Sequence, residues 1–89
     1  MDNEDYIVID VENAMSGMTA ELELPKDSPM RDLLPAIAEQ MDMKPQGLQL
    51  RNKTQGFTYG EMDTLASRNT KEKDHCQLSA VAEQGANVL

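Results

Sequence analysis

With 89 residues, the chain is long enough for one small domain, which buries only about 60–65% of the surface of its unfolded chain and leaves little room for an enzyme's deep cleft. The net charge of −8 disfavours nucleic acid and anionic membranes as partners, because no cluster of Lys and Arg offsets the repulsion locally. The single cysteine cannot form an internal disulfide, and no apolar run approaches the ~20 residues of a membrane span or the shorter core of a signal peptide, so we expect a cytoplasmic protein.

The first predicted elements are two strands joined by a tight turn. In residues 6–13, the β-branched Ile7, Ile9 and Val11 recur at every second position, which suits the pleated surface of a strand. Residues 14–17 end in a Ser-Gly turn, and residues 18–24 alternate apolar and polar side chains again. The two runs predict a hairpin with one buried face, preceded by a disordered N-terminus at residues 1–5.

A helix is predicted next, because apolar residues between positions 29 and 41 recur at helical spacing. Ser28 is the expected N-cap, with Pro29 at the first helical position. Pro35 conflicts with this start, because its ring would clash with the carbonyl of Arg31, and we therefore expect a kinked or irregular first turn. A later start with Asp32 as the cap is the alternative. The apolar positions are Leu33, Leu34, Ile37, Ala38 and Met41.

The second half of the chain predicts three further strands. Residues 48–51 and 57–59 are short extended runs on either side of the turn sequence NKTQG. A polar connection at residues 60–74 follows, and residues 75–82 then alternate apolar and polar side chains as a last strand. Residues 84–89 are predicted to be a flexible C-terminal tail.

This order of elements predicts an α+β fold of the β-grasp type, with a mixed four- to five-stranded sheet packed on one helix. The hairpin and the last strand each offer one apolar face, and the helix offers one apolar stripe to cover them. We expect a monomeric domain at residues 6–83. Its predicted core consists of Ile7, Ile9, Leu22, Leu34, Ile37, Leu50, Leu65 and Leu78.

The candidate chemical groups do not combine into a catalytic or metal site. His75 and Cys76 are adjacent on a strand, so their side chains point to opposite faces and cannot act as a base and a nucleophile. A zinc site needs about four ligands, and one His plus one Cys falls short. Glu21 and Glu23 share a strand face, which permits paired carboxylates but is more typical of a solvated face. We therefore predict a protein that is not an enzyme and has no metal or cofactor.

The methionines are a further candidate for partner binding. Most of them are expected to fill gaps in the core, and any that lie on the surface would suit an adaptable protein-binding patch. The residues concerned are Met15, Met18, Met30, Met41, Met43 and Met62.

Two stretches of the chain resemble ubiquitin-like proteins. The run TLASRNTKEKDHCQL resembles that superfamily's tight loop and last strand, and it matches at Thr64, Leu65 and Asn69. The run TAELELPKDSPMRDLL resembles its second strand and helix entry. Within the superfamily, LELPKDSPMRDLLPAIAEQM and RNKTQGFTY resemble the YukD-like proteins associated with type VII secretion in bacteria.

The resemblance implies a ubiquitin-like fold and a non-enzymatic protein-interaction module in or beside a type VII secretion apparatus. The apolar recognition patch on the last strand of ubiquitin falls on Gln77 and Ser79, so ordinary ubiquitin receptors would lose their main apolar contact. The candidate interaction surface comprises Arg51, Lys53, Phe57, Tyr59, Gln77 and Ser79.

The alternative is a protein modifier. An alignment with ubiquitin from Thr64 onward places Gly85 at the terminal glycine of the family, with Gln84 in place of the preceding glycine and ANVL beyond it. In this interpretation a peptidase cuts after Gly85, and activating and conjugating enzymes transfer the freed carboxylate. Gly85 is then the candidate processing and conjugation site.

Overall fold

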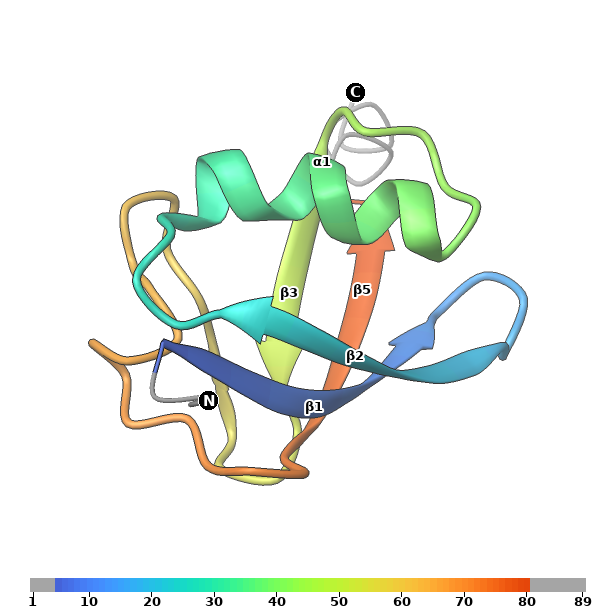
Figure 1. Cartoon of the computed structure of the whole chain (residues 1–89). Coiled ribbons are helices and arrows are strands. Elements are labelled where there is room, and N and C mark those ends of the chain that lie inside the picture. The colour runs from blue at the N-terminus through green and yellow to red at the C-terminus, as the bar shows by residue number, and fades with distance from the viewer. Residues whose placement is uncertain (1–4, 81–89) are drawn as a thin grey trace.

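The computed structural model describes residues 5–80, which form one mixed five-stranded sheet with one helix on one of its faces (Figure 1). The predicted α+β fold is confirmed. Residues 1–4 and the tail at 84–89 lie outside the described residues, as does the predicted end of the domain at residue 83. The elements are β1 (Tyr6–Asn13), β2 (Thr19–Pro25), α1 (Met30–Gln40), β3 (Leu48–Asn52), β4 (Phe57–Thr58) and β5 (His75–Ala80).

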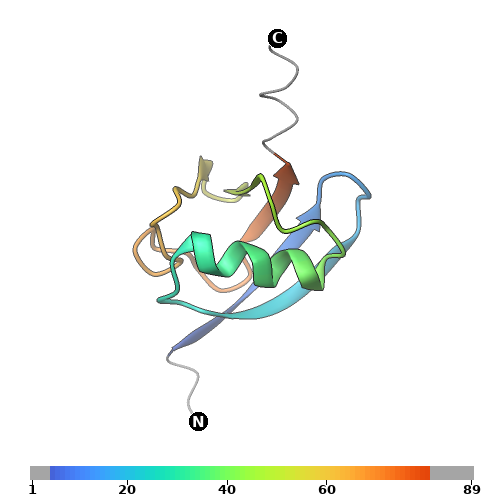
Figure 2. The same ribbon diagram turned by 90° about the horizontal axis from the view of Figure 1, so that it is seen from above.

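The sheet has the strand order β2-β1-β5-β3-β4. Neighbouring strands are antiparallel except for β1 and β5, which run parallel and align Asp10 with His75 and Asn13 with Leu78. The first and the last described strands are therefore neighbours inside the sheet. The helix α1 runs across β3 and β5 in Figure 1 and lies at an angle to β1 in the view from above (Figure 2).

The hydrophobic core lies between α1 and one face of the sheet. Alternate residues of β1 and β5 are buried there, as period-two strands require, and the helix buries positions 30, 33, 37 and 38. Of the predicted core, Ile7, Ile9, Ile37, Leu50, Leu65 and Leu78 are buried, whereas Leu22 and Leu34 are only partly buried at its margin.

The start of α1 is capped by another part of the backbone. The N-cap is Pro29, and no side chain caps the helix, so the predictions of Ser28 and of Asp32 as caps are both wrong. The Met30 N–H donates to the Asp63 carbonyl at 2.9 Å, and the Arg31 N–H donates to the Glu61 carbonyl at 3.0 Å. Two of the donors that every helix leaves free are thus satisfied by the long connection before β5.

Pro35 lies inside α1 without interrupting it. A proline in a helix removes one N–H donor and crowds the carbonyl four residues earlier, here that of Arg31. Both residues are on the exposed side of the helix, where water can reach the carbonyl that lost its donor. The sequence predicted a kinked or irregular first turn, and the structure has one continuous helix from Met30 to Gln40.

Asn13 ties the C-terminal end of the helix to the β1–β2 turn. Its buried side-chain amide donates to the Met41 carbonyl at 3.0 Å, just beyond the last helical residue. Its side-chain oxygen accepts hydrogen bonds from the N–H groups of Met15 at 2.8 Å and Ser16 at 3.2 Å. One side chain therefore satisfies polar groups of two segments that are distant in sequence, which fixes the turn relative to the helix.

Replacing Ile37 by Ala should lower the free energy of unfolding by about 2–5 kcal/mol, because the side chain is fully buried in the helical stripe. Leu34→Ala is the matched control in the same helix and should cost less, since Leu34 is only partly buried. Urea denaturation followed by circular dichroism measures both values. An Ile37→Ala loss no larger than that of Leu34→Ala would contradict the assignment of the buried helix face.

Candidate functional site

His75 and Cys76 lie on opposite faces of β5, as the sequence predicted. Cys76 is fully buried in the core, whereas the ring of His75 lies on the other face, with its Nε2 atom 3.5 Å from Glu12 Oε1. Burial raises the pKa of the Cys76 thiol to about 12, so almost no thiolate is present at neutral pH. Cys76 is therefore an apolar filling residue and not a nucleophile.

A buried polar cluster lies at the C-terminal end of β3, around Asn52. The Asn52 amide donates to Asp74 Oδ2 at 3.0 Å and to the Tyr59 hydroxyl at 3.2 Å, and the hydroxyls of Tyr59 and Thr70 hydrogen-bond each other. The side-chain amide of Gln55 also donates to Asp74 Oδ2, at 2.7 Å. These bonds hold the irregular connection of residues 59–74 against the end of the sheet.

The electrostatics of this cluster indicate a structural role. Burial raises the pKa of Asp74, but hydrogen bonds from the Lys71 N–H, Asn52 and Gln55 outweigh it, so the pKa lies below its ordinary value. Burial raises the pKa of Tyr59, which therefore keeps its proton. A carboxylate that is held by three hydrogen bonds to one of its oxygens, beside a neutral phenol, is poorly suited to proton transfer.

The face of the sheet opposite α1, called the outer face here, brings together three of the predicted interaction residues. Arg51 on β3 is aligned with Gln77 on β5, and Gln77 is aligned with Glu12 on β1. Ser79 lies opposite Gln49, whose side-chain amide is 3.4 Å from the Ser79 hydroxyl. This part of the outer face is polar and lies across the middle strands of the sheet.

Charge is unevenly distributed over the outer face. Strands β1 and β2 contribute the carboxylates of Asp10, Glu12, Glu21 and Glu23 to it, as the register of the hairpin shows. Strand β3 contributes the exposed guanidinium of Arg51. The half of the outer face formed by β1 and β2 is therefore negative, and the half that contains β3 carries a positive charge. A partner that covers both halves would bind in one orientation in preference to others.

The other predicted interaction residues do not join Arg51, Gln77 and Ser79. Lys53 is exposed in the turn after β3. Phe57 is half-buried, with the edge of Tyr59 at a centroid distance of 4.8 Å and the Arg68 guanidinium 4.2 Å from its ring centroid. Tyr59 is buried, so its side chain is not part of an exposed surface. Gly85 lies outside the described residues.

The methionines are more exposed than the sequence analysis predicted. Met30 and Met41 are buried in the core, but Met15, Met18 and Met62 are exposed. Met15 lies in the turn between β1 and β2, and Met18 directly precedes β2. The expectation that most methionines fill the core is wrong for these three.

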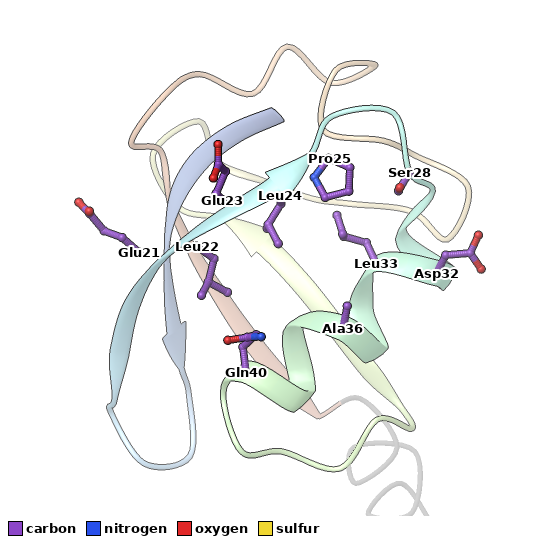
Figure 3. Close-up of a pocket in the computed structure, with 10 residues that line it drawn as sticks. All are labelled: Glu21, Leu22, Glu23, Leu24, Pro25, Ser28, Asp32, Leu33, Ala36 and Gln40. Atoms are coloured by element: carbon purple, nitrogen blue, oxygen red, sulfur yellow. The ribbon is translucent and has the colours of Figure 1, made fainter. Parts of the chain in front are cut away.

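A groove between β2 and α1 was not predicted from the sequence (Figure 3). It has a volume of about 560 Å³, and its two sides are β2 and the helical positions 32, 33, 36 and 40. The only sequence feature that pointed toward this groove is the alternation of Glu21, Leu22, Glu23 and Leu24, which gives β2 one apolar face. The alternation does not show that β2 is an edge strand, and within residues 5–80 no other strand pairs with that edge, which leaves the groove open on that side.

Comparisons with known proteins identify the fold. No family model matches the chain, and no curated protein matches its sequence. A designed protein based on ubiquitin superposes with a TM-score of 0.71 at 18% identity, covering 86% of this chain and 90% of that one. The chain has the ubiquitin-like fold. The ubiquitin of Caldiarchaeum subterraneum superposes with a TM-score of 0.67 at 18% identity, covering 84% of this chain and 92% of that one.

A third ubiquitin-like structure agrees with these two. The N-terminal ubiquitin-like domain of the 4931431F19Rik protein superposes with a TM-score of 0.68 at 18% identity, covering 83% of this chain and 73% of that one. Within residues 5–80, no helix is long and apolar enough to span a membrane. The same described part of the chain contains no group of three or more His, Cys, Asp or Glu residues placed to hold a metal ion.

The lowered pKa of Asp74 predicts a loss of stability in acid. Its contribution is present above the unfolded-state pKa of about 3.9 and is lost as the pH falls through the folded-state pKa. Between about pH 5 and about pH 2, urea denaturation should therefore show a smaller fall in the free energy of unfolding for Asp74→Asn than for the wild type. Asp27→Asn removes an exposed carboxylate and should retain the wild-type fall. Equal falls for all three proteins would contradict the role of Asp74.

The buried thiol predicts very slow chemical modification. At neutral pH a maleimide should label Cys76 of the folded protein far more slowly than in urea, because the thiol is buried and its pKa is raised. Mass spectrometry over time measures both rates. Similar rates with and without urea would show that the β5 register or the burial of Cys76 is wrong.

Proposed function

We propose that the protein is a non-enzymatic interaction module that docks on a protein partner through the outer face of its sheet. The observation that carries this proposal is the row formed across three strands by Arg51, Gln77 and Glu12. The row offers a guanidinium, an amide and a carboxylate on a rigid sheet, so it can hydrogen-bond a partner without rearranging.

The chemistry of the outer face defines the kind of partner. Arg51 and Ser79 provide a charge and hydrogen-bonding groups. Apolar side chains at these positions would instead favour a hydrophobic partner. Binding through this face would therefore depend on charge complementarity and on the salt concentration. Arg51 is the residue expected to contribute most, because arginine combines charge with several fixed donors.

The sequence resemblance to YukD-like proteins supports a more specific role. It suggests a cytoplasmic, monomeric component in or beside a bacterial type VII secretion apparatus. The fold agrees with this placement, since YukD-like proteins are ubiquitin-like, but many other ubiquitin-like proteins share it. The branch therefore rests on the sequence motifs alone.

A pull-down from the native cells tests the proposal. Tagged protein should enrich type VII secretion components after mild crosslinking, and Arg51→Glu should abolish most of that enrichment, because it reverses the only positive charge of the row. Lys44→Glu is the matched control, since it makes the same charge change at an exposed loop residue that is not part of the row. Quantitative mass spectrometry measures the enrichment. Absence of type VII components with wild-type protein, or equal losses in both variants, would contradict the proposal.

The alternative function is that of a protein modifier processed after Gly85. The alignment that places Gly85 at the family's terminal glycine favours it, and the ubiquitin-like fold is compatible with it. A modifier should be found in cells without Ala86–Leu89 and as adducts of higher mass that disappear in a Gly85→Asp variant. A docking module should keep its full length and tolerate that change. Intact-mass measurement of both proteins distinguishes the two functions.

A further inference from the structure

In the described part of the chain, strand β2 forms an open edge of the sheet. The Asn13 N–H donates to the Met18 carbonyl at 2.7 Å, and the Lys26 N–H donates to the Asp5 carbonyl at 2.9 Å. In an antiparallel pair, residues bonded to the partner strand alternate with residues whose backbone groups point away from it. Residues 20, 22 and 24 of β2 are therefore bonded to β1, and the backbone N–H and C=O groups of Thr19, Glu21 and Glu23 point outward.

These outward groups have no backbone partner elsewhere in residues 5–80. Pro25 ends the series, because proline has no N–H to offer. The open stretch is therefore about five residues long, or roughly 17 Å at the usual rise of a strand. This length is enough to pair with a short extended peptide.

The groove lies directly beside this edge on the helix side of the sheet. Figure 3 shows Leu22 and Leu24 pointing from β2 toward Leu33 and Ala36 of α1. Leu22 is only partly buried, and Ala36 is an exposed small residue that leaves space between strand and helix. An added strand could therefore place apolar side chains against an apolar surface that is already formed.

The opposite side of the same edge is negatively charged. Glu21 and Glu23 point away from the groove in Figure 3, and both are exposed. Asp32 adds a third carboxylate at the helical side of the groove. Like charges directly opposite each other on neighbouring strands are unfavourable, so a second copy of β2 would be repelled at this edge. Basic residues would instead be attracted.

We propose that the β2 edge and the adjoining groove bind an extended segment of a partner protein in which basic and apolar residues alternate. Successive side chains of a strand point to opposite faces, so every second residue of the added segment faces the groove and the others face Glu21 and Glu23. Because acidic and apolar side chains alternate along β2, basic and apolar side chains should alternate along the bound segment. The inference rests on the proposed function and adds a second surface, with the chemistry of its partner.

The ammonium group of Lys73 limits how much of the negative charge of this edge is available to a ligand. Its ammonium group lies 3.0 Å from Glu21 Oε2, and this exposed ion pair partly neutralises the edge. A basic ligand must compete with it for Glu21. Removing the ammonium group should therefore strengthen binding, whereas removing the carboxylates should weaken it.

An NMR titration with synthetic peptides tests the proposal. The probe is a heptapeptide of alternating Lys and Val, and the controls are a peptide of the same composition with the valines in one block and a peptide of alternating Glu and Val. The alternating Lys-Val peptide should shift the backbone amides of Glu21 and Glu23 most and slow their exchange with solvent. Binding of the block peptide with equal affinity, or shifts centred on Arg51 and Gln77, would overturn the proposal.

Variants separate edge pairing from general attraction to an acidic protein. Glu21→Lys with Glu23→Lys should weaken binding about tenfold or more, whereas the charge-matched pair Glu39→Lys with Glu61→Lys, at exposed positions outside the groove, should change it little. Lys73→Ala should strengthen binding about twofold to fivefold. Equal weakening by both double variants would overturn the proposal.

A steric variant covers the case in which the charge reversals unfold the protein. Ala36→Arg fills the groove from an exposed helical position and should abolish peptide binding while the amide spectrum stays folded. Unchanged affinity in this variant would overturn the proposal. Failure of the peptide to bind, with the cellular partner still enriched through Arg51, would reject this inference alone. Loss of that enrichment with peptide binding intact would reject only the docking function of the outer face.

Discussion

The buried hydrogen bonds that converge on Asp74 determine how the sheet is completed. The connection between β4 and β5 has no helix or strand of its own, and Asn52, Gln55 and the Lys71 N–H fix its end through one carboxylate oxygen. Because β5 begins at the next residue, its register with β1 and β3 depends on that attachment. Those bonds therefore position both the core face and the outer face of the last strand.

The polar side chains inside this small protein act as connectors between segments. Asn13 links the hairpin turn to the end of the helix, and the Asn52 cluster links the sheet to the long connection. A core limited to one helix and one sheet leaves several loop ends without regular partners, and buried amides satisfy them in place of secondary structure. The surfaces proposed for binding lie outside these clusters, so recognition and stability use different residues.

The periodicity of the sequence predicted each element, and the tight turn predicted the pairing of the first two strands, but local patterns did not predict contacts between distant segments. Alternation assigned Ile9 and Leu78 to the core, because it follows from the geometry of a single strand. The cap of α1 could not be predicted in the same way, since its acceptors come from the carbonyls of Glu61 and Asp63, about thirty residues away. Tyr59 was assigned to the surface for a similar reason: its buried partners lie on other segments. The groove beside β2 depends on strand order, which no local pattern encodes.

The parallel pairing of β1 with β5 has a consequence for synthesis in the cell. It aligns Asp10 with His75, so the first strand of the domain lacks its central neighbour until the last strand has also left the ribosome. The hairpin can form early, because its contacts are local, but its apolar face remains uncovered on one side during elongation. Completion of the sheet must therefore wait until β5 has emerged, and the carboxylates on the outer side of β2 disfavour edge-to-edge pairing between neighbouring hairpins in that interval.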